Sequence, residues 1–221
     1  MYVVDRGGGV PVRIAAADAP IFEPWAPSPD GWKLILPNNS DLVVMNSDGS
    51  GLRRLAAGDY GTAVWSPDSK KIVFVRRGPE GFRSGLLLIG VDGRGERRLT
   101  RNSSDDEAAW APDGKRVAFA RRGTGAMLAD ADGTDLRVLW RSRGVVEGLH
   151  WATDGRSLTF VQGPPLATDR GQFSDLVTIS VPDGRTLRRV QHVDPLGRIA
   201  WSPDGSGSRT GLTTASVLLS L

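Results

Sequence analysis

A five-residue pattern recurs along the chain and limits the folds that it can adopt. Trp65-Ser66-Pro67-Asp68-Ser69 is followed by similar segments that begin at Trp110, Trp151 and Trp201, and an earlier copy has Pro27 in the tryptophan position. The aspartates of the five copies are 38, 45, 41 and 50 residues apart: Asp30, Asp68, Asp113, Asp154 and Asp204. A period of ~40–45 residues with a turn signal in each copy is typical of the four-stranded blades of a β-propeller.

Apolar residues follow these aspartates at fixed offsets of four and six residues. In four copies the two positions hold Leu34 and Leu36, Ile72 and Phe74, Val117 and Phe119, and Leu158 and Phe160. A spacing of two predicts a strand with one buried face. Proline presets φ for a turn and glycine accepts a positive φ. Pro-Asp-Gly therefore predicts a tight turn between this strand, called strand b, and strand a, which ends at the tryptophan.

A second turn signal, Asp-Gly, follows in each of the first four copies and completes four strands per repeat. The run before it predicts strand c, and an apolar residue seven positions after its aspartate marks strand d. These aspartates are Asp48, Asp92, Asp132 and Asp183, and the strand d residues are Leu55, Leu99, Leu139 and Val190. We therefore expect four full blades at residues 23–60, 61–105, 106–145 and 146–195.

The two ends of the chain continue the same pattern. Residues 1–22 are expected to supply strands c and d of a closing blade, and residues 196–221 to supply strand a and a degenerate strand b. Ser208 and Thr210 occupy the usual apolar positions, so residues 206–221 indicate a displaced strand b or the remnant of a truncated repeat. The prediction is one all-β domain, a β-propeller of about five blades. Four are complete, and one is assembled from both termini.

Composition excludes several classes of protein. The 28 glycines and 14 prolines argue against long helices, because they cost a helix interior ~1 and ~3 kcal/mol each. The chain has no cysteine, which excludes disulfides, thiol nucleophiles and zinc–thiolate sites. No apolar run approaches the ~20 residues of a membrane span, and the first residues lack the features of a signal peptide. We expect no membrane insertion, and the compartment stays open.

The charge pattern argues against a nucleic-acid partner. The sequence pI is 9.7, but the net charge is only +3, and the 24 arginines and 4 lysines are interleaved with acids along the chain. Nucleic-acid binders gather their basic residues on one face or stripe.

The Trp-Ser-Pro-Asp-Gly copies are followed in four repeats by an Asp-Gly turn and a strand d, with an arginine before its apolar residue in three of them. This pattern resembles the WD-like "PD" repeats of TolB-type β-propellers. The resemblance covers residues 1 to about 205. It implies a propeller fold, in a family that is typically periplasmic. TolB itself has six such blades and an additional domain, whereas about five blades can be counted here.

The loops between strands b and c are the best candidates for a binding site. In a blade, the a–b and c–d turns lie at one end, the turn end, and the b–c and d–a loops lie at the other, the loop end. Residues 76–85 and 161–175 make the b–c segment the most variable part of the repeat, and variable loops on a rigid scaffold usually carry recognition. The candidate partner-binding residues are Arg76, Arg77, Phe82, Arg83, Arg121, Arg122 and Phe173. Because acids occupy neighbouring loops, the arginines fit either a clamp for carboxylates of a partner or a solvated ion-pair network.

No pattern in the chain indicates catalysis. The sequence has no Gly-x-Ser-x-Gly motif, and its two histidines, His150 and His192, are few for a metal-dependent lyase. Residues 130–135 resemble part of a calcium loop without its distal glutamate, and every repeat has Asp-Gly there. We expect no catalytic residue, metal or cofactor. The expected function is a non-catalytic, monomeric scaffold that binds a protein or peptide. The alternative is an accessory domain or fragment of a larger enzyme, either a prolyl-oligopeptidase-like peptidase or a polysaccharide lyase.

Overall fold

The described part of the chain is built from β-strands, and none of it is helical. The structure, a computed structural model, describes residues 2–3, 12–13, 26–38, 41–58, 60–77, 83–164, 174–193, 199–201, 207–210 and 217–220. The chain divides into two compact units, Met1–Ser103 and Ser104–Leu221. No helix that could span a membrane occurs among the residues named here.

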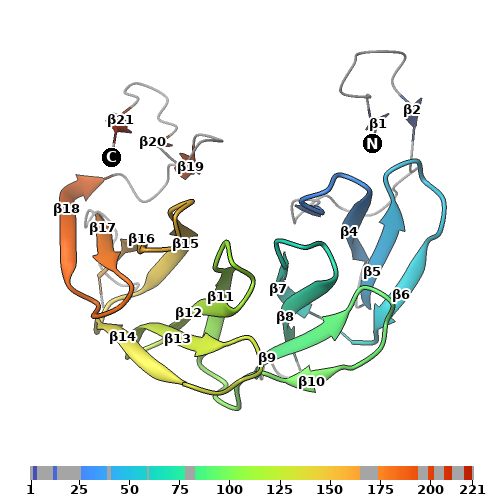
Figure 1. The fold of residues 1–221 in the computed structure, drawn as a ribbon, viewed down its shortest axis with the longest axis horizontal. Helices are drawn as coiled ribbons and strands as arrows, with labels where there is room; N and C mark the ends of the chain where they lie inside the picture. Colours follow the sequence, from blue (N-terminus) through green and yellow to red (C-terminus); the bar gives the residue numbers. More distant parts are fainter. Residues whose placement is uncertain are drawn as a thin grey trace. The chain divides into compact units, whose positions relative to one another are not determined.

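The first unit contains two four-stranded antiparallel sheets in simple a-b-c-d order (Figure 1). The strands of the first sheet are β3 (Ala26–Pro27), β4 (Lys33–Asn38), β5 (Asp41–Asn46) and β6 (Arg53–Ala56). Those of the second are β7 (Tyr60–Trp65), β8 (Lys71–Arg77), β9 (Arg83–Gly90) and β10 (Arg97–Arg98). A short pair, β1 (Tyr2–Val3) and β2 (Val12–Arg13), precedes them.

The second unit repeats this arrangement. Its first sheet holds β11 (Asp105–Trp110), β12 (Arg116–Arg121), β13 (Gly125–Asp130) and β14 (Arg137–Arg141). The next holds β15 (Val146–Trp151), β16 (Ser157–Gln162), β17 (Ser174–Ser180) and β18 (Thr186–Val193). A three-stranded sheet follows, with β19 (Ile199–Trp201), β20 (Gly207–Thr210) and β21 (Val217–Ser220). The all-β propeller fold with four complete blades is therefore confirmed, and we number these blades 1 to 4.

The a–b turns fold as the Ser-Pro-Asp pattern predicts. In blade 2, the Ser66 hydroxyl lies 2.6 Å from the Asp68 carboxylate and accepts a hydrogen bond from the Lys71 amide. The Asp68 carboxylate also accepts the amide N–H of Lys70 at 3.0 Å. These hydrogen bonds lower the pKa of Asp68, with the Ser66 hydroxyl as the main cause. Ser28 and Asp30 form the same turn in blade 1.

Strand b is buried on both faces, which corrects the prediction of one buried face. Leu34 and Leu36 are buried in blade 1 as expected, but Ile35 between them is only 3% exposed. Ile35 packs into a core shared with Ile72 and Phe74 of blade 2. Period-two patterning missed this burial because each sheet of a propeller stacks against a neighbouring sheet, so that both faces of an inner strand are apolar.

Hydrogen bonds join adjacent blades at their inner strands. The indole Nε1 of Trp65 donates to the carbonyl of Ala26 at 2.9 Å, and that of Trp151 donates to Ala109 at 3.1 Å. Both acceptors lie one residue before the tryptophan position of the preceding blade. Trp65 and Trp151 therefore fix the register of their blades on the blade before, whereas the indole nitrogen of Trp110 is buried without an acceptor among the described residues.

Arginines join adjacent blades at their outer strands. The Arg53 guanidinium on β6 donates to the carbonyls of Val91 and Asp92, in the c–d turn of blade 2. Arg137 on β14 donates in the same way to Pro182, in the c–d turn of blade 4, at 3.3 Å. A backbone carbonyl is thus the partner of two arginines whose role sequence analysis did not identify.

The terminal sheets keep the register of the repeat. Tyr2 pairs with Arg13 in the N-terminal pair, as Val43 pairs with Arg54 in blade 1, which agrees with strands c and d. Trp201 pairs with Ser208, at the same offset as Trp65 with Ile72. Strand b of the last repeat is therefore not displaced, and β21 lies beside it as a third strand. The two terminal sheets are separate, and assembly of a fifth blade from both ends stays a prediction.

The core contacts predict a large loss of stability when a strand b aromatic ring is removed. Phe74 is 1% exposed, so Phe74→Ala should lower the free energy of unfolding by ~3–5 kcal/mol. Urea denaturation measures this change, with Leu52→Ala as the control because Leu52 is 68% exposed. A loss for Phe74→Ala close to that of the control would contradict the packing described here.

The turn geometry predicts a pH-dependent effect of Ser66→Ala. Because the folded pKa of Asp68 is lowered, its ionised form contributes stability above its unfolded pKa of about 4, and this contribution is lost as the pH falls through the folded pKa. Ser66→Ala removes the main cause of the lowered pKa. The stability difference between wild type and Ser66→Ala, measured by urea denaturation, should be larger near pH 7 than near pH 3. An equal difference at both pH values would contradict this assignment.

Candidate functional site at the loop ends of the blades

Strand b ends in an arginine in two blades, beside the first residue of strand a. Arg76 at the end of β8 pairs with Tyr60 of β7, and Arg121 at the end of β12 pairs with Asp105 of β11. Each guanidinium also lies over the phenylalanine two residues before it, with 5.7 Å from Arg76 to the Phe74 ring centroid. The repeat thus places the same cationic group at the loop ends of blades 2 and 3.

Arg121 forms a buried ion pair. Its Nε donates to Asp105 Oδ1 at 2.6 Å and its Nη2 to Oδ2 at 3.0 Å, which makes the contact bidentate. The Asp105 side chain is fully buried, and that of Arg121 is 17% exposed. Since two donors and one carboxylate satisfy each other, this geometry agrees with a structural ion pair between strands a and b.

Arg76 is only partly satisfied. Its Nη2 donates to Glu96 at 2.8 Å, and a third of its side chain is exposed. Its Nε is buried and has no acceptor within the described part of the chain. A buried donor without a partner is unusual in a folded protein, so the Arg76 Nε–H is a donor that no described residue uses.

The other candidate residues differ in how much the structure describes. The Arg122 side chain is exposed, and its backbone N–H donates to Ser104. Arg77 and Arg83 pair through their backbones where β8 and β9 meet, and their side chains lie outside the described residues. Phe82 and Phe173 also lie outside them. Their roles in binding stay predictions.

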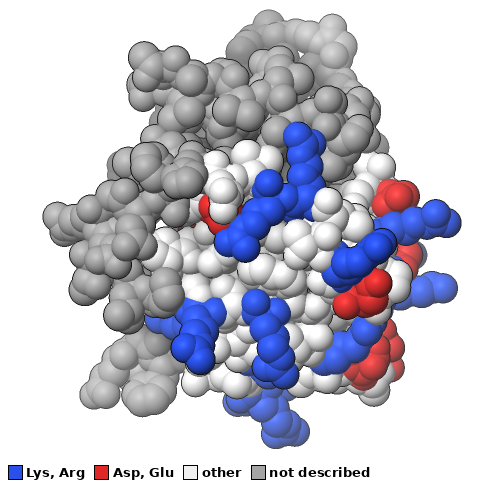
Figure 2. Space-filling model, turned by 90° about the vertical axis from the view of Figure 1, so that its left-hand side faces the viewer, with Lys and Arg blue, Asp and Glu red and all other residues white. Residues whose placement is uncertain are grey.

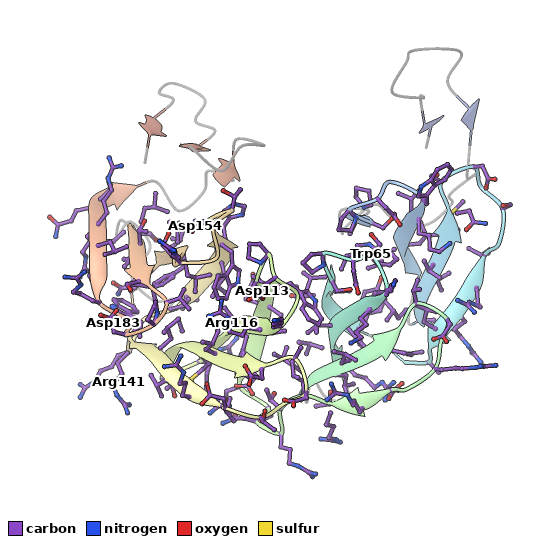
Figure 3. The ribbon with its side chains drawn as sticks, in the orientation of Figure 1. Trp65, Asp113, Arg116, Arg141, Asp154 and Asp183 are labelled. Atoms are coloured by element: carbon purple, nitrogen blue, oxygen red, sulfur yellow. The ribbon has the colours of Figure 1, made fainter. Side chains whose placement is uncertain are left out.

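Two further arginines lie at the loop end of blade 3. Arg141 ends β14, Arg143 follows in the d–a loop, and both side chains are exposed. The ribbon shows the labelled Arg141 pointing away from the sheets (Figure 3). Sequence reasoning missed this pair because it searched the variable b–c segments, whereas the d–a loops have nearly constant length. The signal was the local sequence Arg-Ser-Arg-Gly, which contains no acid.

Strand a is distorted close to the loop end. A β-bulge interrupts the pairing of β11 between Asp106 and Ala108, and that of β15 between Glu147 and His150. Glu107 in the first bulge has φ 48°, and Gly148 in the second has φ 62°. A left-handed backbone is strained for a residue other than glycine, so Glu107 is held there by the surrounding structure.

The described side chains at the loop ends favour binding of anions by guanidinium groups. Burial lowers the pKa of His150 on β15, so that this imidazole is neutral near pH 7. Within the described ranges, no group of three or more histidine, cysteine, aspartate or glutamate side chains could hold a metal ion. Within the described ranges, exposed arginines are among the loop-end side chains that could bind a ligand.

Comparison with solved structures identifies the same fold in several proteins. TolB from Acinetobacter baumannii superposes with a TM-score of 0.71 at 18% identity, over 98% of this chain and 55% of that one. Putative TolB from Agrobacterium tumefaciens gives 0.64 at 18% identity, over 87% and 73% of the two chains. Oligogalacturonate lyase from Vibrio parahaemolyticus gives 0.71 at 15% identity, over 95% and 63%.

These similarities show a TolB-like β-propeller fold. This chain spans about half the length of the Acinetobacter TolB chain. No protein-family model matches the sequence, and no curated protein sequence matches it. Because propellers of one fold include TolB and a lyase, the fold does not decide the function.

The buried ion pair predicts unequal effects of two neighbouring arginines. Arg121→Ala leaves the buried Asp105 carboxylate without a counter-charge, which should cost ~3–5 kcal/mol of stability. Arg122→Ala removes an exposed side chain and should change stability by less than ~0.5 kcal/mol. Chemical denaturation of both variants measures the difference. Equal effects would show that Asp105 does not depend on Arg121.

Proposed function

We propose that the chain is a non-catalytic β-propeller scaffold that binds a protein or peptide partner at the loop ends of its blades. The observation that carries this proposal is the exposed arginine side chains at the loop end of blade 3, Arg122, Arg141 and Arg143. Arginine is enriched among the residues that dominate interface energies. The TolB-like fold is consistent with a scaffold of this kind.

The turn ends are less suited to recognition because their polar groups bond within the turns. Asp48, for example, accepts hydrogen bonds from both the amide and the hydroxyl of Ser50. One feature favours the opposite assignment: Trp32 and Leu52, near the turns of blade 1, are 71% and 68% exposed. Their exposure makes the turn end of blade 1 the rival surface in any test.

Hydrogen exchange distinguishes the two ends. The chain is immobilised to capture its partner, and exchange is then compared between the free chain and the purified complex. Protection of residues 122–124 and 141–145, with none at residues 28–33 and 46–52, is the expected result. Protection confined to residues 28–33 and 46–52 would place the partner at the turn end and contradict the proposal.

The alternative is an accessory propeller, or part of one, from a larger enzyme. Solved structures of the same fold include an oligogalacturonate lyase and an acylaminoacyl peptidase, so the fold does not choose between the two enzyme classes. Incubation of the chain with oligogalacturonate and with a peptide library tests it directly. Turnover that a single substitution in this chain abolishes would replace the non-catalytic proposal.

A further inference from the structure

We propose that Arg122, Arg141 and Arg143 form a carboxylate-binding site for an acidic segment of the partner protein. The inference rests on the proposed function and names the chemistry that the partner presents. All three residues belong to blade 3 in the second unit. They are defined here as the arginine corner.

Backbone hydrogen bonds bring the arginine corner together. Strands β12 and β13 are joined by residues 122–124, and the Thr124 N–H donates to the Arg121 carbonyl at 2.9 Å. The Ser142 N–H donates to the Thr124 carbonyl, also at 2.9 Å, and Arg141 pairs with Gly125 across strands β14 and β13. The b–c loop that carries Arg122 is therefore bonded to the segment that carries Arg141 and Arg143.

Two glycines allow this close approach. Gly125 has φ 121°, and a Cβ at this position would collide with the Trp140 carbonyl and the Ser142 amide. A Cβ at Gly144 would collide with the Gly163 carbonyl at the end of β16. The segment 141–144 is thus held on one side by β13 and on the other by blade 4. A fixed backbone reduces the entropy lost when its side chains bind a ligand.

The three guanidinium groups differ in their bonding from several other arginines of the same unit. Arg116, Arg121, Arg137 and Arg189 each form an ion pair with an aspartate. The side chains of Arg122, Arg141 and Arg143 form no hydrogen bond or ion pair with any described residue. Their donors are consequently available to a ligand without breaking a bond to any described residue.

Among the described residues, few acids near the corner are exposed. Asp105 is engaged by Arg121, and Asp106 and Glu107 have partners of their own. Glu147, near the start of β15, is exposed and forms no ion pair with the described residues. Among the described residues here, the three arginines are exposed, Asp106 and Glu107 are half-buried, and Glu147 of blade 4 is exposed. This balance of exposed groups favours an anionic ligand.

A carboxylate-bearing chain suits the corner better than one small anion. The planar guanidinium fork matches a carboxylate with two parallel hydrogen bonds. An exposed ion pair contributes only ~0–1 kcal/mol, so affinity requires several carboxylates on one ligand. Alternate side chains of an extended peptide lie on the same side, ~7 Å apart, and can reach successive arginines.

A labelled glutamate-rich peptide serves as the probe, and its binding to the full chain is measured by fluorescence anisotropy at low salt. Replacement of Arg122, Arg141 and Arg143 together by alanine should weaken binding at least about tenfold. Replacement of all three by lysine keeps the charge but not the fork, and should recover only part of this loss. Thermal unfolding of each variant verifies that it is folded.

Three cations at the turn end of the same unit provide a matched control. Lys115, Arg156 and Arg185 are exposed, and their replacement by alanine removes the same charge. Binding should stay within about twofold of wild type. Equal losses in the two triple variants would show a non-specific charge effect and overturn the proposal.

Two other results would also overturn it. Binding of oligogalacturonate without binding of the peptide would assign the corner to an acidic polysaccharide. A captured partner that protects residues 122–124 and 141–145 equally in wild type and in the alanine variant would remove the arginine corner while leaving the proposed function intact. If the captured partner protects no residue at the loop ends, the proposed function itself is wrong. The hydrogen-exchange result therefore distinguishes failure of the arginine corner from failure of the proposed function.

Discussion

Contacts between successive sheets determine most of this structure. A single four-stranded sheet with apolar residues on both faces cannot bury them. It becomes stable when another sheet packs against each face. The indole of Trp65 bonds to Ala26 of the blade before it, and the indole of Trp151 bonds to Ala109 in the same way. In both cases the hydrogen bond of the tryptophan aligns two neighbouring blades and, with them, the apolar faces that pack together. Phe74 and Ile35 meet in one core because that register is fixed.

Several of the described arginines have structural roles. The first arginine of strand d bonds to the c–d turn of the next blade, as Arg53 does. The second bonds to an acid at the start of strand c, as Arg54 does with Asp41 and Arg189 with Asp175. The side of the molecule that carries β18 shows arginine and lysine side chains spread widely, with acids mostly along one margin (Figure 2). A high pI therefore identifies no ligand here, because many of these arginines bond within the protein or are spread singly over the surface.

Sequence patterns predicted the fold well because turn chemistry and core positions recur together. The aspartate offsets located Ile72 and Phe74 in strand b, and both are buried. The burial of Ile35 was missed, since period-two patterns describe a sheet with one wet face. The pattern also could not reveal that Asp105 is buried beneath Arg121, because the two residues are distant in sequence and their pairing depends on strand register. Arg141 was overlooked for a different reason. It precedes a d–a loop whose length is nearly constant among the repeats, and the search for binding residues was limited to segments of variable length.

The spacing of the inter-blade bonds has a consequence for biosynthesis. Trp65 lies 39 residues after its acceptor, Trp151 lies 42 residues after its own, and Arg137 lies 45 residues before Pro182. Each bond thus spans a single repeat, and closing a loop of that length carries a modest entropic penalty. A blade can dock on its predecessor soon after it leaves the ribosome, before later repeats exist. Folding can therefore proceed from the N-terminus at the pace of translation. An apolar sheet face within a unit is then exposed only until the next repeat has been synthesised and has packed against it.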